Sequence, residues 1–181
     1  MKLNIIGIVG VIILFISLAL PWWTMTLGPS GTNNAGYTGN VAIYPYQATA
    51  SLNPPGSSLV IRTDIWYGWV SLAFVILGGL LGIAGSLLRG AKVLLVGGGL
   101  LALLSIIIFA VGLQSDLSNS SFAEGWPALG LFANGTFGGY AYTTYLSFGF
   151  WLALAATIIM LFASLKKPKS IAPTAPPPLS A

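Results

Sequence analysis

The sequence predicts a mainly α-helical membrane protein: a four-transmembrane-helix bundle with a small antiparallel extracellular β-sheet built from its two outer loops. Of the 181 residues, 56% are hydrophobic and only 6% are charged, whereas soluble domains carry about 25% charged residues. The apolar residues gather in four long stretches, and a helix needs about 20 such residues to cross the hydrocarbon core of a bilayer. Because so few charges cannot cover a water-facing surface, most of the surface is expected to face lipid or other protein.

The apolar runs of the four predicted spans contain no Asp, Glu, Lys or Arg, and aromatic residues mark their ends, as in interfacial belts. The predicted interface anchors are Trp22, Trp23, Trp66, Trp69 and Trp151. The predicted division is a first span at 1–22 (apolar from 4), an outer loop with a β-hairpin at 23–65, a second span at 66–88, an inner turn at 89–92, a third span at 93–113, an aromatic-rich outer loop at 114–145, a fourth span at 146–165, and a cytoplasmic, Lys/Pro-rich disordered tail at 166–181.

The distribution of basic residues predicts the orientation. All but one of them fall on the side of the chain termini, and only Arg62 falls on the other side, with all the acids. By the positive-inside rule, both termini are expected in the cytoplasm of a multi-pass plasma-membrane protein. The net charge of +4 then reflects topology, and nucleic acid is not an expected partner. The basic residues on the terminal side are Lys2, Arg89, Lys92, Lys166, Lys167 and Lys169, and the acids opposite are Asp64, Asp116 and Glu124.

The first span ends in Pro21 followed by two tryptophans. Its apolar run is about as long as a full span, whereas signal-peptide cores have roughly 7–15 residues. An uncleaved helix is therefore expected, with Trp22 and Trp23 holding its outer end at the headgroups. The alternative is a secretion signal cut near Ser17-Leu18-Ala19, which fits the small-x-small pattern of cleavage sites.

Small residues recur at helical spacing in the spans. Because lipid supplies no hydrophobic drive between helices, such residues allow the close backbone contact that holds membrane helices together. They predict either a self-contained bundle or a face for dimerisation or a partner. The predicted helix-packing residues are Gly78, Gly82, Ser86, Gly98, Ala102, Ser105, Gly149 and Ala153.

The outer loops have the composition of a folded β domain. Residues 41–52 and 57–64 are rich in β-forming residues and flank the turn signal Asn-Pro-Pro-Gly, which predicts a hairpin. Strands are also expected at 23–27 and 138–145. The loop aromatics are expected either to pack the sheet onto the helix ends or to form a patch for a neighbouring protein. Asn119 and Asn134 fit the N-x-Ser/Thr acceptor pattern for glycosylation.

Residues that catalyse reactions or bind metals are scarce. The chain has no cysteine and no histidine, which excludes disulfides and the usual zinc, haem and iron–sulfur ligation. The acids lie far apart in sequence and outside the predicted spans. Proton relays and ion paths usually need ionisable groups inside the spans. No catalytic residue, metal or cofactor is therefore predicted, and the chain is not expected to be an enzyme. An active site completed by a partner chain is the enzymatic alternative.

The layout of residues 1–165 resembles that of the claudin-like four-helix proteins. It shares with them inner termini, a long β-rich first outer loop, a short inner turn and a second outer loop that supplies a further strand. Tryptophans after the first span, Trp22 or Trp23, and before the second, Trp66, are similar to the loop tryptophans of that family. The family's W…GLW…C…C motif needs two cysteines, which this chain lacks. The interval from Trp23 to Trp66 is also longer than the spacing in that motif. The resemblance implies adhesion, barrier formation or an accessory role.

We therefore expect a non-catalytic integral membrane protein that acts by contact. It would serve as a structural or accessory subunit of a membrane assembly, through its extracellular sheet and its Gly-lined helix faces. The expected partners are the lipid bilayer and other membrane-protein subunits or copies of itself. The alternative is a homo-oligomeric pore or channel lined by Ser, Thr and backbone carbonyls, which needs no charged groups.

Overall fold

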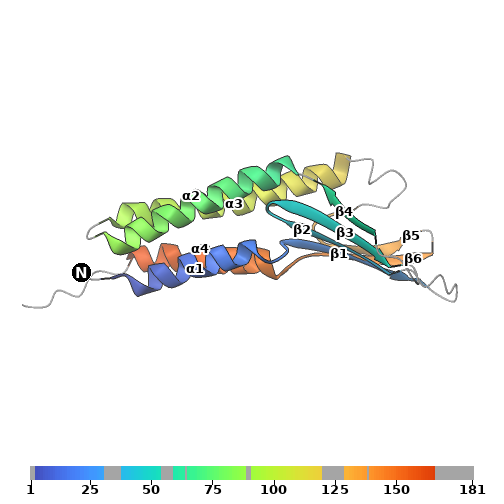
Figure 1. The fold of residues 1–181 in the computed structure, drawn as a ribbon, viewed down its shortest axis with the longest axis horizontal. Helices are drawn as coiled ribbons and strands as arrows, with labels where there is room; N and C mark the ends of the chain where they lie inside the picture. The colour runs from blue at the N-terminus through green and yellow to red at the C-terminus, as the bar shows by residue number, and fades with distance from the viewer. Residues whose placement is uncertain are drawn as a thin grey trace, which may run out of the picture.

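The computed structural model describes residues 3–30, 38–53, 59–63, 65–88, 91–119, 129–137 and 139–165. Within them the chain forms four helices and a six-stranded antiparallel sheet, so the protein is mainly helical with one small sheet (Figure 1). The elements are α1 (Ile5–Leu18), β1 (Trp23–Pro29), β2 (Thr38–Tyr44), β3 (Gln47–Asn53), β4 (Leu59–Thr63), α2 (Trp66–Leu87), α3 (Lys92–Asn119), β5 (Ala133–Phe137), β6 (Tyr140–Leu146) and α4 (Phe148–Leu165).

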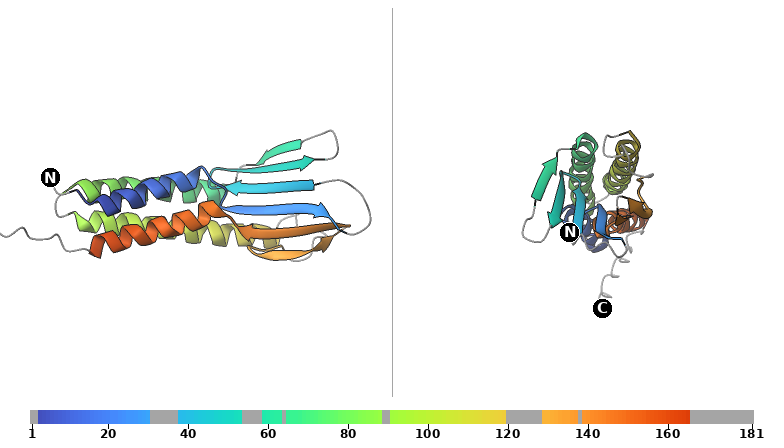
Figure 2. Two further views of the ribbon diagram at one scale, coloured as in Figure 1. Left: turned by 90° about the horizontal axis from the view of Figure 1, so that it is seen from below. Right: turned by 90° about the vertical axis from the view of Figure 1, so that its right-hand side faces the viewer.

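The helices lie side by side in two layers, α2 with α3 and α1 with α4 (Figure 1). The sheet continues the α1/α4 layer, because β1 follows α1 and β6 leads into α4 (Figure 2). The last turns of α3 extend beyond the other helices and lie over one face of the sheet. With 28 residues, α3 is about 42 Å long at 1.5 Å per residue, well beyond the hydrocarbon thickness of about 30 Å.

Three helices, α2, α3 and α4, are long and apolar enough to cross a membrane. The fourth apolar helix, α1, has 14 residues and ends at Leu18, so it is shorter than the stretch 4–22 predicted from the sequence. Two features account for the early end. Pro21 cannot donate a helical hydrogen bond, and Ala19 and Leu20 close the last turn on the carbonyls of Ile16 and Ser17.

The strands run in the order β4-β3-β2-β1-β6-β5. The strands expected at 23–27 and 138–145 correspond to β1 and β6, which pair with each other although they lie far apart in sequence. The β-rich segment 41–52 differs from expectation, because it divides between β2 and β3, which form a tight hairpin with Pro45 and Tyr46 between Tyr44 and Gln47. A proline at a turn needs no ladder hydrogen bond, which explains its position. The residues of the Pro-Pro-Gly turn lie outside the described residues.

The two faces of the sheet differ in composition. On one face, the register aligns Leu146, Trp23, Ile43 and Ala48, and next to them Thr144, Met25, Val41 and Ala50. Trp23, Met25 and Ile43 belong to the buried core, and this face is covered by the end of α3. The other face, here called the polar face, has a row that crosses five strands. That row consists of Asn134, Thr143, Thr26, Asn40 and Ser51.

Small residues bring α2 and α3 into backbone contact. A Cβ at Gly78 would lie 2.7 Å from the Gly98 carbonyl oxygen and 3.1 Å from the Ala102 nitrogen. Two helical turns away, the hydroxyls of Ser71 and Ser105 lie 2.7 Å apart, and each also lies within hydrogen-bond distance of the other residue's carbonyl oxygen. Their burial away from water is compatible with stability because these hydrogen bonds replace hydration.

Gly98→Ala and Gly97→Ala form a matched pair at neighbouring positions of α3. A Cβ at Gly98 would lie 2.5 Å from the Gly78 carbonyl oxygen, whereas one at Gly97 meets nothing within 4 Å. We expect Gly98→Ala to lower the free energy of unfolding by about 1–3 kcal/mol, or several degrees of unfolding temperature. Gly97→Ala should be neutral or slightly stabilising, because Ala favours the helix. Thermal unfolding in one detergent measures both, and equal unfolding temperatures would contradict this packing.

Candidate functional site

The junction between helices and sheet is built around Trp22, which is fully buried. Its backbone N–H donates to the Ile43 carbonyl oxygen at 2.8 Å, and its own carbonyl accepts the Ser147 N–H at 2.9 Å. Its indole Nε1 donates to the Ser17 carbonyl oxygen at 3.0 Å. The residue therefore ties the end of α1 to β2 and to the start of α4. Edge-on ring contacts with Phe109 and Phe150, at centroid distances of 5.0 and 6.2 Å, add α3 to this cluster.

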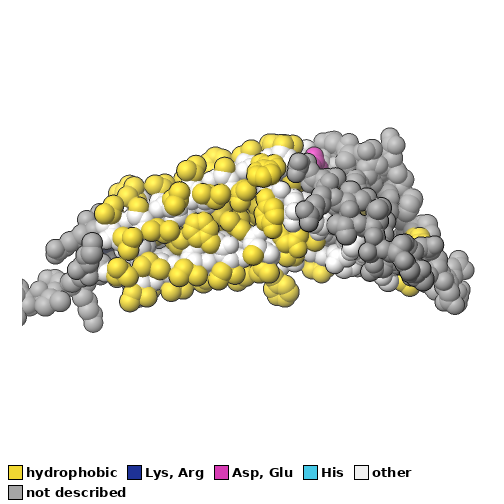
Figure 3. Space-filling model, viewed as in Figure 1, with side chains coloured by type: hydrophobic (Ala, Val, Ile, Leu, Met, Phe, Trp, Pro, Cys, Tyr) yellow, Lys and Arg dark blue, Asp and Glu magenta, His cyan; other side chains and the backbone are white. Residues whose placement is uncertain are grey.

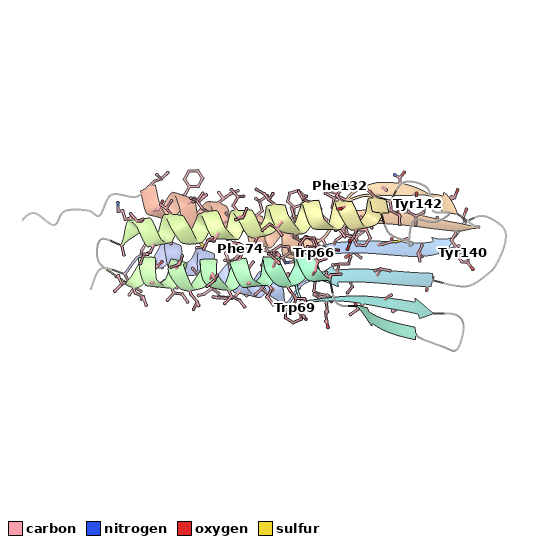
Figure 4. The ribbon with its side chains drawn as sticks, turned by 90° about the horizontal axis from the view of Figure 1, so that it is seen from above. Trp66, Trp69, Phe74, Phe132, Tyr140 and Tyr142 are labelled. Carbon is pink, nitrogen blue, oxygen red and sulfur yellow. The ribbon has the colours of Figure 1, made fainter. Side chains whose placement is uncertain are left out.

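The tryptophans predicted as interface anchors fall into two groups. Trp22 and Trp23 lie inside the protein, 0% and 2% exposed, so their contacts are with protein rather than with headgroups. Trp66, Trp69 and Trp151 are about half exposed or more, and Figure 4 shows Trp66 and Trp69 at the start of α2, beside the sheet. The aromatics of the second loop also divide, because Tyr142 is buried and Phe132 is exposed.

An apolar cavity of about 340 Å³ lies between the sheet and the end of α3. Its walls come from three strands, from the start of α2, from the last turns of α3 and from the segment before β5. Almost all of its lining side chains are hydrophobic, and the exceptions include a carboxylate and a phenol. The lining residues are Trp23, Met25, Val41, Ile43, Ala48, Thr49, Ala50, Ile65, Tyr67, Leu113, Asp116, Leu117 and Leu129.

Trp23, one of the residues that line this cavity, carries a buried polar atom. Its indole Nε1 is buried and has no hydrogen-bond partner among the described residues. A buried N–H without an acceptor costs about 1–3 kcal/mol relative to one that is satisfied. Trp22 and Trp23 differ in this respect, since consecutive residues at the start of a strand point in opposite directions, and only Trp22 reaches an acceptor.

Asp116 and Tyr67 form the polar pair of the cavity. The Tyr67 side chain is almost fully buried, and its hydroxyl interacts with the Asp116 carboxylate as a hydrogen-bond donor. Gly112, one turn before Asp116, makes room for the phenol ring, because a Cβ there would lie 2.5 Å from the Tyr67 Cβ and Cγ. The carboxylate is half-buried, so it brings a negative charge to an otherwise apolar site.

The groups that line this site are mainly apolar side chains. Within the described ranges, no group of three or more His, Cys, Asp or Glu residues is placed to hold a metal ion. The cavity supplies an apolar volume whose lining includes one carboxylate, that of Asp116. Binding pockets for small molecules commonly combine such apolar walls with a few placed polar groups.

The predicted helix-packing residues make contacts within this chain. Gly78 meets Gly98 and Ala102, and Gly82 lies against Val11 and Met160. Ser105 bonds with Ser71. The others are also buried: Ser86 lies beside Gly7, Gly149 beside Pro21 and Trp22, and Ala153 is 0% exposed.

The two predicted glycosylation sites are in different elements. Asn134 is exposed on β5, in the row of the polar face. Asn119 is the last residue of α3, and the Ser that completes its acceptor pattern lies outside the described residues.

The cavity was not predicted from the sequence. The signal that could have indicated it is the adjacent pair Trp22-Trp23 at the start of a strand, because alternation sends one ring to each side. Tyr67 and Asp116 carried no signal, since they lie on different helices and far apart in the chain. Comparison with protein-family models and with curated proteins gives no match for this chain.

A double-mutant cycle tests the pair in the cavity. Tyr67→Phe should lower the free energy of unfolding by about 1–2 kcal/mol, because a half-buried carboxylate loses its donor. In an Asp116→Ala background the same change should cost less, with a coupling of about 0.5 kcal/mol or more. Tyr145→Phe, at an exposed phenol, should change stability by less than about 0.5 kcal/mol. Denaturation in detergent measures all four, and additive effects of the two changes would contradict the interaction.

Proposed function

We propose that this is a non-catalytic membrane protein that acts by contact, as a structural or accessory subunit of a membrane assembly. The observation that supports it best is the row of uncharged polar side chains on the polar face, contributed by five of the six strands. Water-facing surfaces usually carry roughly 25–35% charged residues, and depletion of charge marks the core of protein–protein interfaces. An amide- and hydroxyl-bearing row is suited to hydrogen bonding with a partner without the cost of stripping water from charges.

The geometry of the row supports this proposal. Thr143, Asn40 and Asn134 are exposed, and Thr26 and Ser51 are half-buried. Two hydroxyls are already oriented by bonds across the strands: Thr26 Oγ1 donates to the Thr143 carbonyl oxygen at 3.5 Å and Ser51 Oγ to the Asn40 carbonyl oxygen at 3.4 Å. Side chains held in this way lose less conformational entropy on binding.

The helical part supports a place in the membrane. Hydrophobic side chains cover it in Figure 3, with no Lys or Arg among the described side chains on the face shown. We propose that α1 is the fourth span of a plasma-membrane protein with both termini in the cytoplasm and the sheet outside. The glycine-bearing helix faces contribute by packing the helices of one chain together, which leaves the polar face for a partner.

The claudin-like relationship is part of the same proposal. Four helices with a sheet at one end, and a strand from the second loop beside β1, support the resemblance drawn from the sequence. The lack of cysteines separates this chain from the family's motif. A common layout would favour a contact role over an enzymatic one.

The absence of native cysteines allows a direct test of orientation. Single variants Thr136→Cys on β5 and Ser170→Cys in the C-terminal segment each introduce the only thiol. A membrane-impermeant maleimide should label Thr136→Cys on intact cells, and Ser170→Cys only after permeabilisation. Labelling of Ser170→Cys on intact cells would overturn the orientation, and equal access from both sides would show a mixed insertion.

The contact itself can be tested with a photo-crosslinking amino acid at Thr143. In native membranes it should capture one defined protein, either a second copy or another subunit, whereas the same probe at Val111, exposed on α3, should capture lipid. In a separate co-purification without the probe, Thr143→Lys should reduce recovery of the captured protein at least about tenfold, because the contact would bury an unpaired charge. Ser118→Lys, at an exposed position of α3, is the matched control.

Two outcomes would count against a contact role. Recovery of only a monomer in several mild detergents, with no protein adduct at Thr143, would contradict it. Conductance in reconstituted bilayers that survives Thr143→Lys would favour the homo-oligomeric pore instead.

A further inference from the structure

The sheet ends in two edge strands, β5 at one side and β4 at the other (Figure 2). Among the described residues, no further strand pairs with the outer side of either one. An edge strand offers a row of N–H and C=O groups to another chain, and proteins usually block such edges with lysine, proline or bulges. β5 reads Ala-Asn-Gly-Thr-Phe, without charge or proline, and Arg62 is the single charged residue of β4. Both edges are therefore open to pairing.

We propose that copies of this chain join edge to edge in one membrane, with β5 of one copy pairing with β4 of the next. The partner is a second copy of this chain, and the contact is a ladder of backbone hydrogen bonds. This inference rests on the proposed insertion with the sheet outside the membrane. It goes beyond the contact role of the polar face, because edge pairing leaves that face open.

The directions of the two edge strands fit each other. β4 leads into α2 and so runs toward the helices, whereas β5 runs away from them, because it is antiparallel to β6, which leads into α4. The strands extend along the direction of the helices (Figure 2), and helices inserted in the same sense hold every copy upright. β5 of one copy and β4 of its neighbour are then antiparallel, whereas two β5 strands would be parallel and would not continue the antiparallel ladder.

The hydrogen-bonding groups of the two edges are also complementary. In a hairpin with a two-residue loop the closing pair is hydrogen-bonded, and bonded and non-bonded pairs then alternate along the strands. Counted from the closing pair of β5 and β6, the N–H and C=O of Asn134 point outward. The same count from the hairpin of β2 and β3 leaves those of Val60 pointing outward from β4. Each residue thus offers one donor and one acceptor, so the pair can exchange two hydrogen bonds.

The membrane sets the register of this contact. Asn134 and Val60 stand at the two ends of one row across the sheet, the row of the polar face. Two copies inserted to the same depth therefore bring Asn134 of one opposite Val60 of the other. The polar row of each copy then continues into the next one.

The pairing of unlike edges has a consequence for assembly size. Each contact leaves a free β4 at one end of the assembly and a free β5 at the other. Head-to-tail contacts of this kind form rings where the rotation closes and open rows where it does not. We therefore expect assemblies larger than a dimer.

The chain has no cysteine, which allows a disulfide test with Asn134→Cys and Val60→Cys in one chain. Residues opposite each other in a hydrogen-bonded pair have Cα atoms about 5.5 Å apart, a separation that suits a disulfide. Within one chain the two positions lie at opposite edges of six strands, about 24 Å apart along the sheet. Mild oxidation of native membranes should therefore link different copies, in a reducible ladder of dimers, trimers and larger species.

Single variants provide the matched control. Asn134→Cys alone and Val60→Cys alone should stay monomeric on oxidation, because like edges do not meet. When the two single variants carry different tags and are expressed together, they should form mixed dimers and nothing larger.

Thr136→Pro and Thr136→Ala test whether the backbone of β5 makes the contact. The Thr136 N–H also points outward by the same count, so proline there removes no hydrogen bond within the sheet. In the double-cysteine chain, Thr136→Pro should lower cross-linking at least about fivefold, because a donor is lost from the edge. Thr136→Ala keeps the N–H and should leave cross-linking unchanged.

The proposal is overturned if the double-cysteine chain stays monomeric, if Asn134→Cys alone forms dimers as readily, or if Thr136→Pro and Thr136→Ala cross-link alike. Unfolding temperatures identify variants that have lost the fold, and if Thr136→Pro is one of them, the cysteine pair decides the question. A protein adduct at Thr143 without a disulfide ladder would keep the contact role and remove edge pairing. A ladder without such an adduct would do the reverse.

Discussion

The attachment of the sheet to the helices depends on the hydrogen bonds and ring contacts of Trp22. Its backbone joins β2 to the start of α4, and its indole closes the end of α1. Gly149 permits this geometry, because a Cβ there would lie 2.6 Å from the Leu20 carbonyl oxygen and from the Trp22 ring. Since the chain leaves α1 and enters α4 through these contacts, the start of β1 lies beside the end of β6. The rest of the sheet is added to that pair.

At the opposite end of the helices, Asn4 plays the corresponding role. Its side chain accepts the Gly7 N–H and donates to the Ala163 carbonyl oxygen, and its backbone N–H donates to the Ser86 carbonyl oxygen. It thereby links the start of α1 to the ends of α4 and α2. Between the two ends, small residues keep the helix axes close, because hydrocarbon around the helices gives little drive for association. Polar bonds at both ends and close packing between them hold α1, the shortest helix, in place.

Much of the fold can be predicted from patterns that are local in sequence. Uninterrupted apolar runs predicted α2, α3 and α4. The β-forming residues near Trp23 and Tyr142 predicted strands that the structure contains as β1 and β6. The end of α1 was misplaced, because the apolar pattern continues past Leu18 while Pro21 and the demands of the sheet end the helix. The division of 41–52 at Pro45 was missed because hydrophobic alternation does not reveal a two-residue turn. The length of α3 was underestimated, because its last turns are amphipathic and pack on the sheet rather than in lipid.

The candidate site could not be predicted in the same way, because its groups come together only through long-range packing. Tyr67 and Asp116 are brought together by the contact of α2 with α3. Trp23, at the start of β1, lines the same cavity. For residues such as Ser71 and Ser105, the sequence does not show whether the hydroxyl makes a structural hydrogen bond or has a functional role. Only their mutual hydrogen bonds in the folded chain do so.

The register of β1 determines what each face of the sheet presents. Trp23 and Met25 face the cavity, while Thr26 belongs to the polar row, and a slip of one residue would exchange the two sets. The slip is opposed at the residue just before the strand, because the backbone N–H and carbonyl of Trp22 are hydrogen-bonded to Ile43 and to Ser147. The same contacts that attach the sheet therefore also keep the apolar side chains over α3 and the uncharged polar side chains exposed. A chain that lost them would lose both surfaces together, even with every strand still formed.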